Sequence, residues 1–246
     1  MAEGNADRLL RWRKRPGGRP VMYQTWTDLL FAHWEAPAEL LQATLPAGLT
    51  VETYEGRAYV GVVPFYMRGV RPTGVPPIPG FSNFLELNVR TYVQDAHRNP
   101  GVWFYSLDCN HPFAVWFARA LLGLPYQHAR MKARRLEREP ILYETRRWRK
   151  PITSRFSYDI VGENTSAVPG SLEFFLVERY LLFTVHHGRL FRAQVHHHPY
   201  PLSTTELGDF AVEGFMPAGP NYRERPAHVI GSSGVQVEIF GAVPVS

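Results

Sequence analysis

The sequence predicts an α+β fold made mainly of antiparallel strands, which close into a β barrel with short flanking helices. Three observations support this class. Strand-like segments outnumber helical ones, the helices are short, and turn residues separate neighbouring strand segments as in hairpins. With 246 residues, 45% apolar and 20% charged, the chain can form one β-rich domain with a substantial core. We therefore predict a single domain over residues 21–246.

The first half of this domain is predicted to contain two hairpins and two short helices. Pro37 favours the start of a short helix, and residues 112–123 form a second one, because proline suits a first helical turn and glycine a helix end. Glu55-Gly56 predicts a hairpin turn. The proline-rich segment 71–80 is expected to be a loop, and a lid role is left open. Strands are expected over residues 25–34, 49–54, 57–67, 81–93 and 101–108.

The second half continues the pattern of strands and short helices. Charged and apolar residues alternate over 131–149, as in strands with one solvent-facing side. Ser171 is expected to cap a short helix over 172–179. Gly188-Arg189 predicts the turn of a hairpin between residues 181–187 and 190–198. A helix from Thr204 to Val212 and a last strand over 235–243 complete the expected elements.

The net charge of +5 is concentrated at the N-terminus. Residues 1–20 hold six basic side chains against two acidic ones, Glu3 and Asp7, so they contribute +4 of the total. A basic segment can bind phosphates without specificity. We expect a flexible, solvated arm instead, and we do not expect nucleic acid to be the main ligand. Assembly into a homo-oligomer is left open.

Composition also limits the cellular setting. The sequence holds no long apolar run and no apolar segment after its N-terminal charges, so we expect neither a membrane span nor a secretory signal. Its single cysteine, Cys109, cannot form an internal disulfide, which fits the cytoplasm. Cys109 is either a nucleophile or, as we expect, a small buried core residue.

The clearest local pattern is FLELNVRTYV. In a strand, Glu86, Asn88, Arg90 and Tyr92 point to one side and form a polar row about 20 Å long. One interpretation is a solvent-facing surface. The other is a row that faces an enclosed space, because the neighbouring strand over 101–108 is apolar on both sides. Buried polar groups need partners, which a small ligand would supply.

Histidines are frequent, but their spacing argues against a metal site. Adjacent histidines on one strand point to opposite faces, so neither 186–187 nor 196–198 chelates easily. His197 is instead a candidate cavity residue, next to its cross-strand neighbour Tyr180. No phosphate-binding loop, dinucleotide fingerprint or nucleophile elbow is present, so we expect neither a metal nor a cofactor.

Five segments together resemble the YqjF-like family of uncharacterised bacterial proteins: LLFAHWEAPAELLQATLPAGL, FLELNVRTYV, GVWFYSLD, GLPYQHA and ERYLLFT…RLFRAQVHHHPYPL. The resemblance runs from about residue 25 to 243. That family is related in fold to acetoacetate decarboxylase, a barrel of antiparallel strands around an internal cavity. The resemblance therefore implies the same barrel here.

The resemblance also implies a changed active site. In acetoacetate decarboxylase, a Tyr-Pro-Lys-Lys segment supplies the lysine that forms an imine with the substrate ketone. The matching stretch here is Leu124-Pro125-Tyr126-Gln127, so Tyr126 stands at the lysine position. Glu86 matches an active-site glutamate of the decarboxylase. The decarboxylase also has a second key acid and an arginine in its active site. The positions of this chain that fall near them hold Val62 or Val63 and Trp26, so neither group has a convincing counterpart.

The lysine inventory strengthens this departure. Only Lys14, Lys132 and Lys150 are present, and Lys132 lies about 20 Å from Tyr126 on strand geometry. We therefore expect no Schiff-base decarboxylation. Any activity would be of a lyase or hydrolase type on a small carbonyl or carboxylate compound.

We expect a small-molecule-binding cavity in which Glu86 acts as an acid or base and Arg90 binds a ligand carboxylate. The remaining candidate ligand-binding residues are Asn88, Tyr92, Tyr126 and His197. The alternative is a non-catalytic interaction protein, whose Arg-rich arm and 130–150 strands bind a macromolecule such as nucleic acid.

Overall fold

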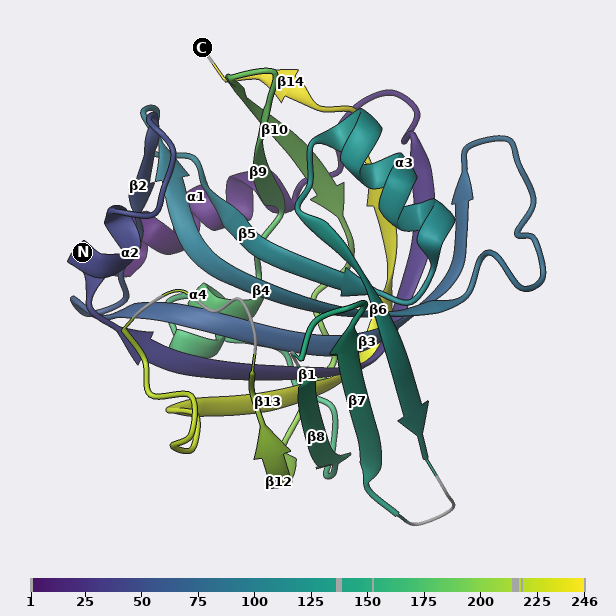
Figure 1. The fold of residues 1–246 in the computed structure, drawn as a ribbon. Coiled ribbons are helices and arrows are strands. Elements are labelled where there is room, and N and C mark those ends of the chain that lie inside the picture. The colour runs from purple at the N-terminus through teal and green to yellow at the C-terminus, as the bar shows by residue number, and fades with distance from the viewer. Residues whose placement is uncertain (1, 136–138, 152, 214–216, 218, 246) are drawn as a thin grey trace.

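The structure is a computed structural model that describes residues 2–135, 139–151, 153–213, 217 and 219–245. Within these residues, fourteen strands and four helices give an α+β fold with one large mixed sheet (Figure 1). The helices are α1 (Ala2–Arg13), α2 (Ala38–Gln42), α3 (Pro112–Leu122) and α4 (Leu172–Val177). The strands are β1 (Met22–Ala36), β2 (Leu49–Val51), β3 (Ala58–Pro72), β4 (Phe84–Asp95), β5 (Pro100–Cys109), β6 (Tyr126–Arg134), β7 (Ile141–Arg147), β8 (Thr153–Ile160), β9 (Leu181–His186), β10 (Arg189–His196), β11 (Leu202–Ser203), β12 (Thr205–Ala211), β13 (His228–Ile239) and β14 (Val243–Pro244).

The expectation of antiparallel pairing is only partly right. Most neighbouring strands are antiparallel, but β5 pairs in parallel with both β6 and β9. The first parallel pair arises because α3 connects β5 to β6, and a crossover helix returns the chain in its original direction. The main order through the sheet is β12-β8-β7-β6-β5-β9-β10-β13-β1-β3-β4-β2, with an additional β4–β5 pairing.

Strand β4 lies between two apolar clusters, which fixes the direction of its side chains. Leu85, Leu87 and Val89 belong to one cluster together with residues of β6, β7 and β8. Phe84 and Tyr92, on the opposite face, belong to the other cluster, which includes residues of α4 and β13. In Figure 1, β6–β8 extend to one side of the long strands β1, β3 and β4, and β9 and β10 rise on the other side.

Three short helices form where the sequence predicts them. Ser171 Oγ accepts a hydrogen bond of 3.2 Å from the Phe174 amide and caps α4. Gly123 ends α3 with φ +62°, a conformation that glycine adopts without strain. Within the described residues, no helix combines the length and the apolar character needed to cross a lipid bilayer.

The helix predicted from Thr204 to Val212 is wrong. Residues Thr205–Ala211 form β12, which pairs with β8. The exposed edge of β8 supplies backbone partners, and this tertiary pairing overrides the weak local helix signal.

Of the two predicted hairpin turns, one is shifted by a residue and the other forms where the sequence predicts it. The β9–β10 turn consists of His187 and Gly188, both with positive φ as a two-residue hairpin turn requires, while Arg189 pairs with His186. The turn at Glu55-Gly56 forms as predicted, with positive φ at both residues and a bridge between Tyr54 and Arg57. The flanking strands do not continue as a hairpin, because β2 pairs with β4 instead of β3.

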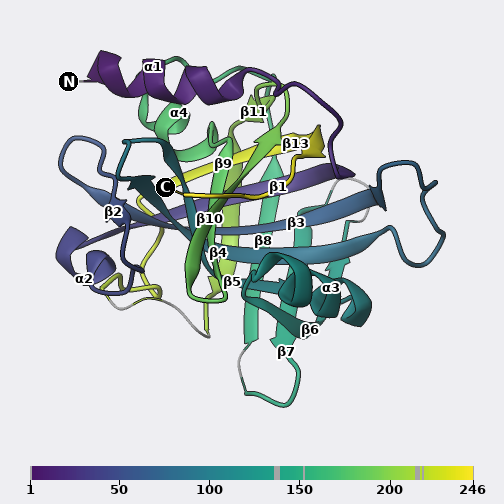
Figure 2. The ribbon, with the colours of Figure 1, turned by 90° about the horizontal axis from the view of Figure 1, so that it is seen from above.

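The N-terminal segment is packed, in contrast to the expected flexible arm. Helix α1 lies across the fold next to α4 (Figure 2). Its Leu9 is 1% exposed and packs in one cluster with Phe174. Arg8 donates to Gln94, and Trp12 Nε1 donates to Asn99 at 3.2 Å. The apolar side of α1, which includes Leu9, therefore packs against the fold, although the basic charge of residues 1–20 predicted a solvated arm.

Candidate functional site

A cavity of about 370 Å³ lies inside the curved sheet. Its wall is built by residues from both ends of the chain, from β1, β3, β4 and β5 as well as β9, β10 and β13. Most lining residues are apolar, including Leu29, Phe31, Phe65 and Val195. This volume and lining are typical of a small-molecule site.

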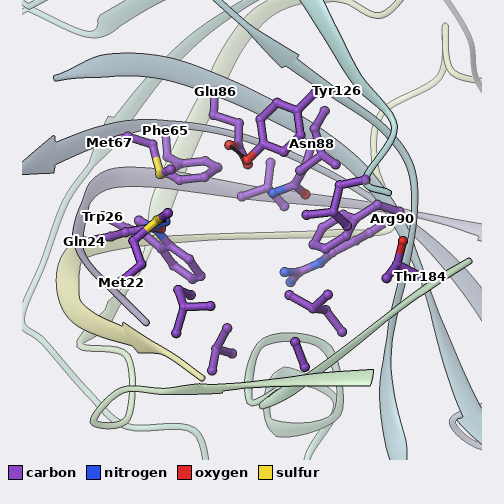
Figure 3. A pocket seen from close by; sticks show the side chains of 18 of the residues that line it. Met22, Gln24, Trp26, Phe65, Met67, Glu86, Asn88, Arg90, Tyr126 and Thr184 are labelled. Carbon is purple, nitrogen blue, oxygen red and sulfur yellow. Dashed lines mark hydrogen bonds between the residues drawn. The ribbon is translucent and has the colours of Figure 1, made fainter. Parts of the chain in front are cut away.

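Strand β4 supplies the two charged side chains that line the cavity and one of its side-chain amides. Glu86, Asn88 and Arg90 all line it, and they are only 4%, 5% and 7% exposed. Alternation along β4 explains this arrangement, because Leu87 and Val89 point to the apolar cluster under β6–β8. Three of the four residues of the polar row, Glu86, Asn88 and Arg90, therefore point into the cavity (Figure 3).

Tyr126 and Glu86 both line the cavity and are hydrogen-bonded to each other. Tyr126 Oη donates a hydrogen bond of 2.6 Å to Glu86 Oε2. The tyrosine is the first residue of β6 and pairs with Leu107 of the parallel strand β5. Gly123 ends α3 and lets the chain turn into β6 here. Burial and the neighbouring Glu86 raise the pKa of Tyr126 well above its ordinary value, so its hydroxyl remains a donor.

Glu86 is poised between its two protonation states. Burial is the main cause that raises its pKa from 4.5 to about 7, and the charge of Asp108 adds to the rise. The hydrogen bonds from Tyr126 and Asn88 act in the opposite direction, since they stabilise the carboxylate. A carboxyl group with a pKa near 7 can give or take a proton at neutral pH.

Arg90 brings a positive charge into the cavity without a carboxylate partner among the described residues. Its Nη2 donates to the Leu176 carbonyl at 3.1 Å, and its guanidinium lies 5.5 Å from the ring centre of Phe31. Arg90 Nε and Asn88 Oδ1 are buried and have no hydrogen-bond partner within the described part of the chain. A buried guanidinium of this kind is costly unless an anion pairs with it.

The other two candidate residues lie behind the cavity wall. Tyr92 is fully buried, but it packs against Phe175 of α4 and under the Arg179 guanidinium instead of lining the cavity. His197 stacks on Tyr180 with ring centres 4.8 Å apart and contacts Tyr200, whose side chain does line the cavity. Burial lowers the pKa of His197 to about 4, so this imidazole is neutral at pH 7.

Four lining residues with polar groups were missed by the sequence analysis: Gln24, Trp26, Thr184 and Tyr200. A bulge in β1 hides the first two, because Asp28 has φ +54° and the pairing with β3 shifts register beyond Thr27. Cavity-facing residues are even-numbered before this bulge and odd-numbered after it. Because the parity changes at the bulge, alternation applied along the whole of β1 does not place Gln24 and Trp26 on the same side as Leu29 and Phe31. Alternation over residues 22–26 alone does place Gln24 and Trp26 on one side.

The remaining candidate groups for covalent or metal chemistry lie elsewhere. Lys14, Lys132 and Lys150 are all exposed, and none of them lines the cavity. Cys109 is fully buried, and burial raises its thiol pKa to about 12. In the part of the chain that the structure describes, no three His, Cys, Asp or Glu side chains gather closely enough to hold a metal ion.

Solved structures with a similar fold are acetoacetate decarboxylase-like proteins. An acetoacetate decarboxylase-like enzyme from Sphingomonas wittichii RW1 matches with a TM-score of 0.64 at 15% identity, over 93% of this chain and 94% of that one. The enduracididine biosynthesis enzyme MppR, in a complex with pyruvate, matches with a TM-score of 0.65 at 12% identity, over 95% and 93% of the two chains. Acetoacetate decarboxylase from Legionella pneumophila matches with a TM-score of 0.61 at 13% identity, over 94% and 88%. These likenesses show a shared fold.

Sequence comparison identifies the family. The uncharacterized protein YqjF of Bacillus subtilis (strain 168) is 38% identical over 192 residues, which cover 78% of each chain. The model of the DUF2071 family, described as an uncharacterized conserved protein, matches residues 23–236. This protein therefore belongs to the DUF2071 family and has an acetoacetate decarboxylase-like α+β fold.

Proposed function

We propose that the cavity binds a small molecule that carries a carboxylate together with a carbonyl or hydroxyl group. The observation that supports this most is Arg90, a buried cation that lacks a carboxylate partner among the described residues and lines the cavity beside the unpartnered Asn88 Oδ1. A ligand carboxylate would pair with the guanidinium, and arginine suits such a contact because its fork can donate two parallel hydrogen bonds. The proposal includes the expectation from the sequence that the strands close into a barrel around this cavity.

Glu86 and Tyr126 would contact the second polar group of the ligand. Glu86 and Arg90 are four residues apart on β4, which places their Cα atoms about 13 Å apart on strand geometry. A ligand between them therefore meets Arg90 at one point and the Tyr126–Glu86 pair at another. Protonated Glu86 can donate to a carbonyl oxygen, and ionised Glu86 can accept a proton from a hydroxyl, a water or an activated carbon.

One feature of a similar protein and one feature of this chain agree with this proposal. A solved structure of MppR is a complex with pyruvate, a small oxo acid, and this chain has a similar fold. The lysines of this chain are exposed and away from the cavity, so the proposed binding and proton transfer use no imine.

Calorimetric titration with paired ligands tests the proposal. Small oxo and hydroxy acids should bind, while their uncharged amides should bind at least about tenfold more weakly, as expected for the loss of one charged contact. Arg90→Gln should abolish this preference for the acid. Arg155→Gln, at an exposed position of β8, should leave it intact. If no acid in the series binds, or if Arg90→Gln retains the preference, the proposal fails.

One observation favours a second candidate, binding of an anionic macromolecule. A hollow of about 490 Å³ lies on the β6–β7 hairpin. The described residues that line it are Arg130, Arg146, Arg147, Trp148, Arg149, Lys150 and Pro151. Arg130 pairs directly with Arg146 across the hairpin, an arrangement that costs energy unless an anion lies between them. The Arg130 guanidinium lies 4.7 Å from the ring centre of Trp148, which is 45% exposed. Phosphates and a stacked base fit such a surface.

Fluorescence anisotropy with a labelled single-stranded oligonucleotide tests this second candidate. Binding should weaken as salt rises and should be lost in the double variant Arg146→Ala/Arg149→Ala. Arg57→Ala, which removes an exposed arginine from another surface, is the control. Equal binding by the double variant and the control would exclude the hairpin as the binding surface.

A further inference from the structure

A second, smaller cavity adjoins the one that contains Arg90. It has a volume of about 200 Å³ and lies between α3 and the 73–83 loop, which projects from one edge of the fold (Figures 1 and 2). The two cavities share five lining residues: Met22, Gln24, Met67, Pro72 and Tyr126. We call the smaller cavity the annex. The shared wall makes the annex a lateral extension of the main cavity.

The order of groups along the two cavities is fixed by the strands. Figure 3 shows Arg90 at one side of the main cavity and Met22, Gln24 and Met67 at the other, with Glu86 and Tyr126 on the wall between them. The annex begins at these methionines and at Tyr126. A ligand whose carboxylate contacts Arg90 would therefore point its far end toward the annex.

The annex is lined mainly by apolar side chains, which would surround the far end of the ligand. Val70, Ile78, Phe84 and Ala118 are among its lining residues, and no Arg, Lys, Asp or Glu side chain of the described residues contributes to it. This lining contrasts with the main cavity, where Arg90 and Glu86 are present. An apolar group gains free energy on entering such a space, whereas a charged group would lose its hydration without compensation.

The polar side chains of the annex already have local partners. Ser82 Oγ accepts from the Ile78 amide at 2.8 Å, and His111 Nδ1 accepts from the Ala114 amide at 3.1 Å. Gln24 Oε1 accepts from Trp26 Nε1 at 2.8 Å. In the main cavity, by contrast, Arg90 Nε and Asn88 Oδ1 are unpartnered. The annex is thus built for an apolar occupant.

The roof of the annex is formed by apolar side chains that remain partly exposed. Ile78 and Phe81 of the 73–83 loop are 51% and 58% exposed. The Phe81 ring contacts His111, at the start of α3, with ring centres 5.4 Å apart. A hydrocarbon chain below this roof would contact the inner faces of these residues and reduce their exposure to water.

We infer that the ligand is an amphipathic acid, whose carboxylate contacts Arg90 and whose hydrocarbon tail extends past Tyr126 into the annex. This inference rests on the proposed function, because it takes the carboxylate contact as its starting point. It adds the class of ligand: a medium-chain oxo or hydroxy acid, in place of a two- or three-carbon acid that would leave the annex empty.

A chain-length series separates the inference from the proposal on which it rests. Straight-chain 2-oxo acids from pyruvate to 2-oxodecanoate would be titrated calorimetrically at concentrations below micelle formation. We expect pyruvate to bind weakly and each methylene that enters the annex to lower the Kd by about fourfold. Binding that does not improve with length would overturn the annex inference and leave the proposed function standing. Failure of every acid to bind would reject both.

Two variants locate the gain in affinity. Ala118→Leu fills the annex from α3 and should remove the advantage of long chains while pyruvate binding is unchanged. Ile78→Ala, at the exposed roof, should reduce the advantage with little risk to folding. Trp116→Ala removes an exposed aromatic side chain from the same helix, outside the annex, and serves as the control. An equal loss in Trp116→Ala, or a long-chain advantage that survives both annex variants, would overturn the inference.

Discussion

Tyr126 Oη donates a 2.6 Å hydrogen bond to Glu86 Oε2 and so joins the start of β6 to β4 inside the cavity. The resemblance of this sequence to acetoacetate decarboxylase matches Tyr126 to the imine-forming lysine of that enzyme. A phenol at this position is a hydrogen-bond donor at neutral pH, because burial and Glu86 both raise its pKa. The pair can position a ligand oxygen and exchange its proton, but it cannot form an imine.

The Tyr126→Phe variant should raise the pKa of Glu86 above about 7. The lost hydrogen bond stabilises the carboxylate, whereas burial, which remains, stabilises the neutral acid. Titration of the Glu86 carboxyl carbon by NMR measures this change. Tyr105→Phe, at a tyrosine hydrogen-bonded to Thr44 outside the cavity, is the matched control. A lower Glu86 pKa in Tyr126→Phe contradicts this account of the pair.

The pH dependence of stability should report Glu86 directly. Its pKa is higher in the folded state, about 7, than the ordinary value of 4.5, so the folded state holds the proton more tightly. The contribution of Glu86 to the free energy of unfolding is therefore full below pH 4.5 and is lost as the pH rises to about 7, by about 3 kcal/mol.

Urea denaturation of the native protein and of Glu86→Gln at pH 4.5, 6 and 8 isolates this contribution. The variant is neutral at every pH, so the difference in unfolding free energy between the two proteins should grow from pH 4.5 to 8 in favour of the variant. Contributions of groups that the two proteins share cancel in this difference. A difference that is constant with pH would show that Glu86 ionises normally in the fold.

Arg90→Met should give a protein as stable as the native one, or more stable by about 1 kcal/mol. A buried guanidinium without a carboxylate partner destabilises a fold, and an apolar side chain of similar length removes that cost. The lost contacts are the hydrogen bond to the Leu176 carbonyl and the contacts of the guanidinium with the Phe31 and Tyr92 rings. Thermal unfolding without ligand measures the effect. A loss of several kcal/mol would instead assign Arg90 a structural role at α4.

Borohydride reduction in the presence of acetoacetate should leave no covalent adduct on the protein. The three lysines are exposed and lie away from the cavity lining, so none has the apolar surroundings that lower an amine pKa for imine formation. Intact-mass spectrometry provides the measurement. An adduct that maps to Lys132 and is competed by a cavity ligand would reverse this prediction.

Leu9→Ala should destabilise the protein by about 2 kcal/mol, the lower end of the usual cost of truncating a buried leucine. Leu9 is 1% exposed and packs with Phe174, the residue whose amide is capped by Ser171. Leu142→Ala, at a position that is 55% exposed, should change stability by less than about 0.5 kcal/mol. Equal stability of the two variants would mean that α1 does not anchor the N-terminus.

Local chemistry was sufficient to predict most individual elements. Proline, serine and glycine at the ends of α2, α3 and α4 act on their own neighbours in the chain, so their signals are readable without the fold. Alternation along FLELNVRTYV likewise separates Leu85, Leu87 and Val89 from Glu86, Asn88 and Arg90. It cannot decide which side is enclosed, because that depends on strands far away in the sequence.

The tertiary structure decided everything that depends on pairing between distant segments. β12 is a strand because β8 offers it an edge, and α1 is ordered because Phe174 and Leu9 pack together. Because of the bulge at Asp28, Gln24 and Trp26 line the cavity from even-numbered positions, whereas the cavity-lining residues of β1 after the bulge are odd-numbered. The sequence by itself predicted, through its resemblance to acetoacetate decarboxylase, that Tyr126 stands at the position of the imine-forming lysine. Only the fold brings Tyr126 within 2.6 Å of Glu86, since a hydrogen bond between residues 40 positions apart depends on how strands pack.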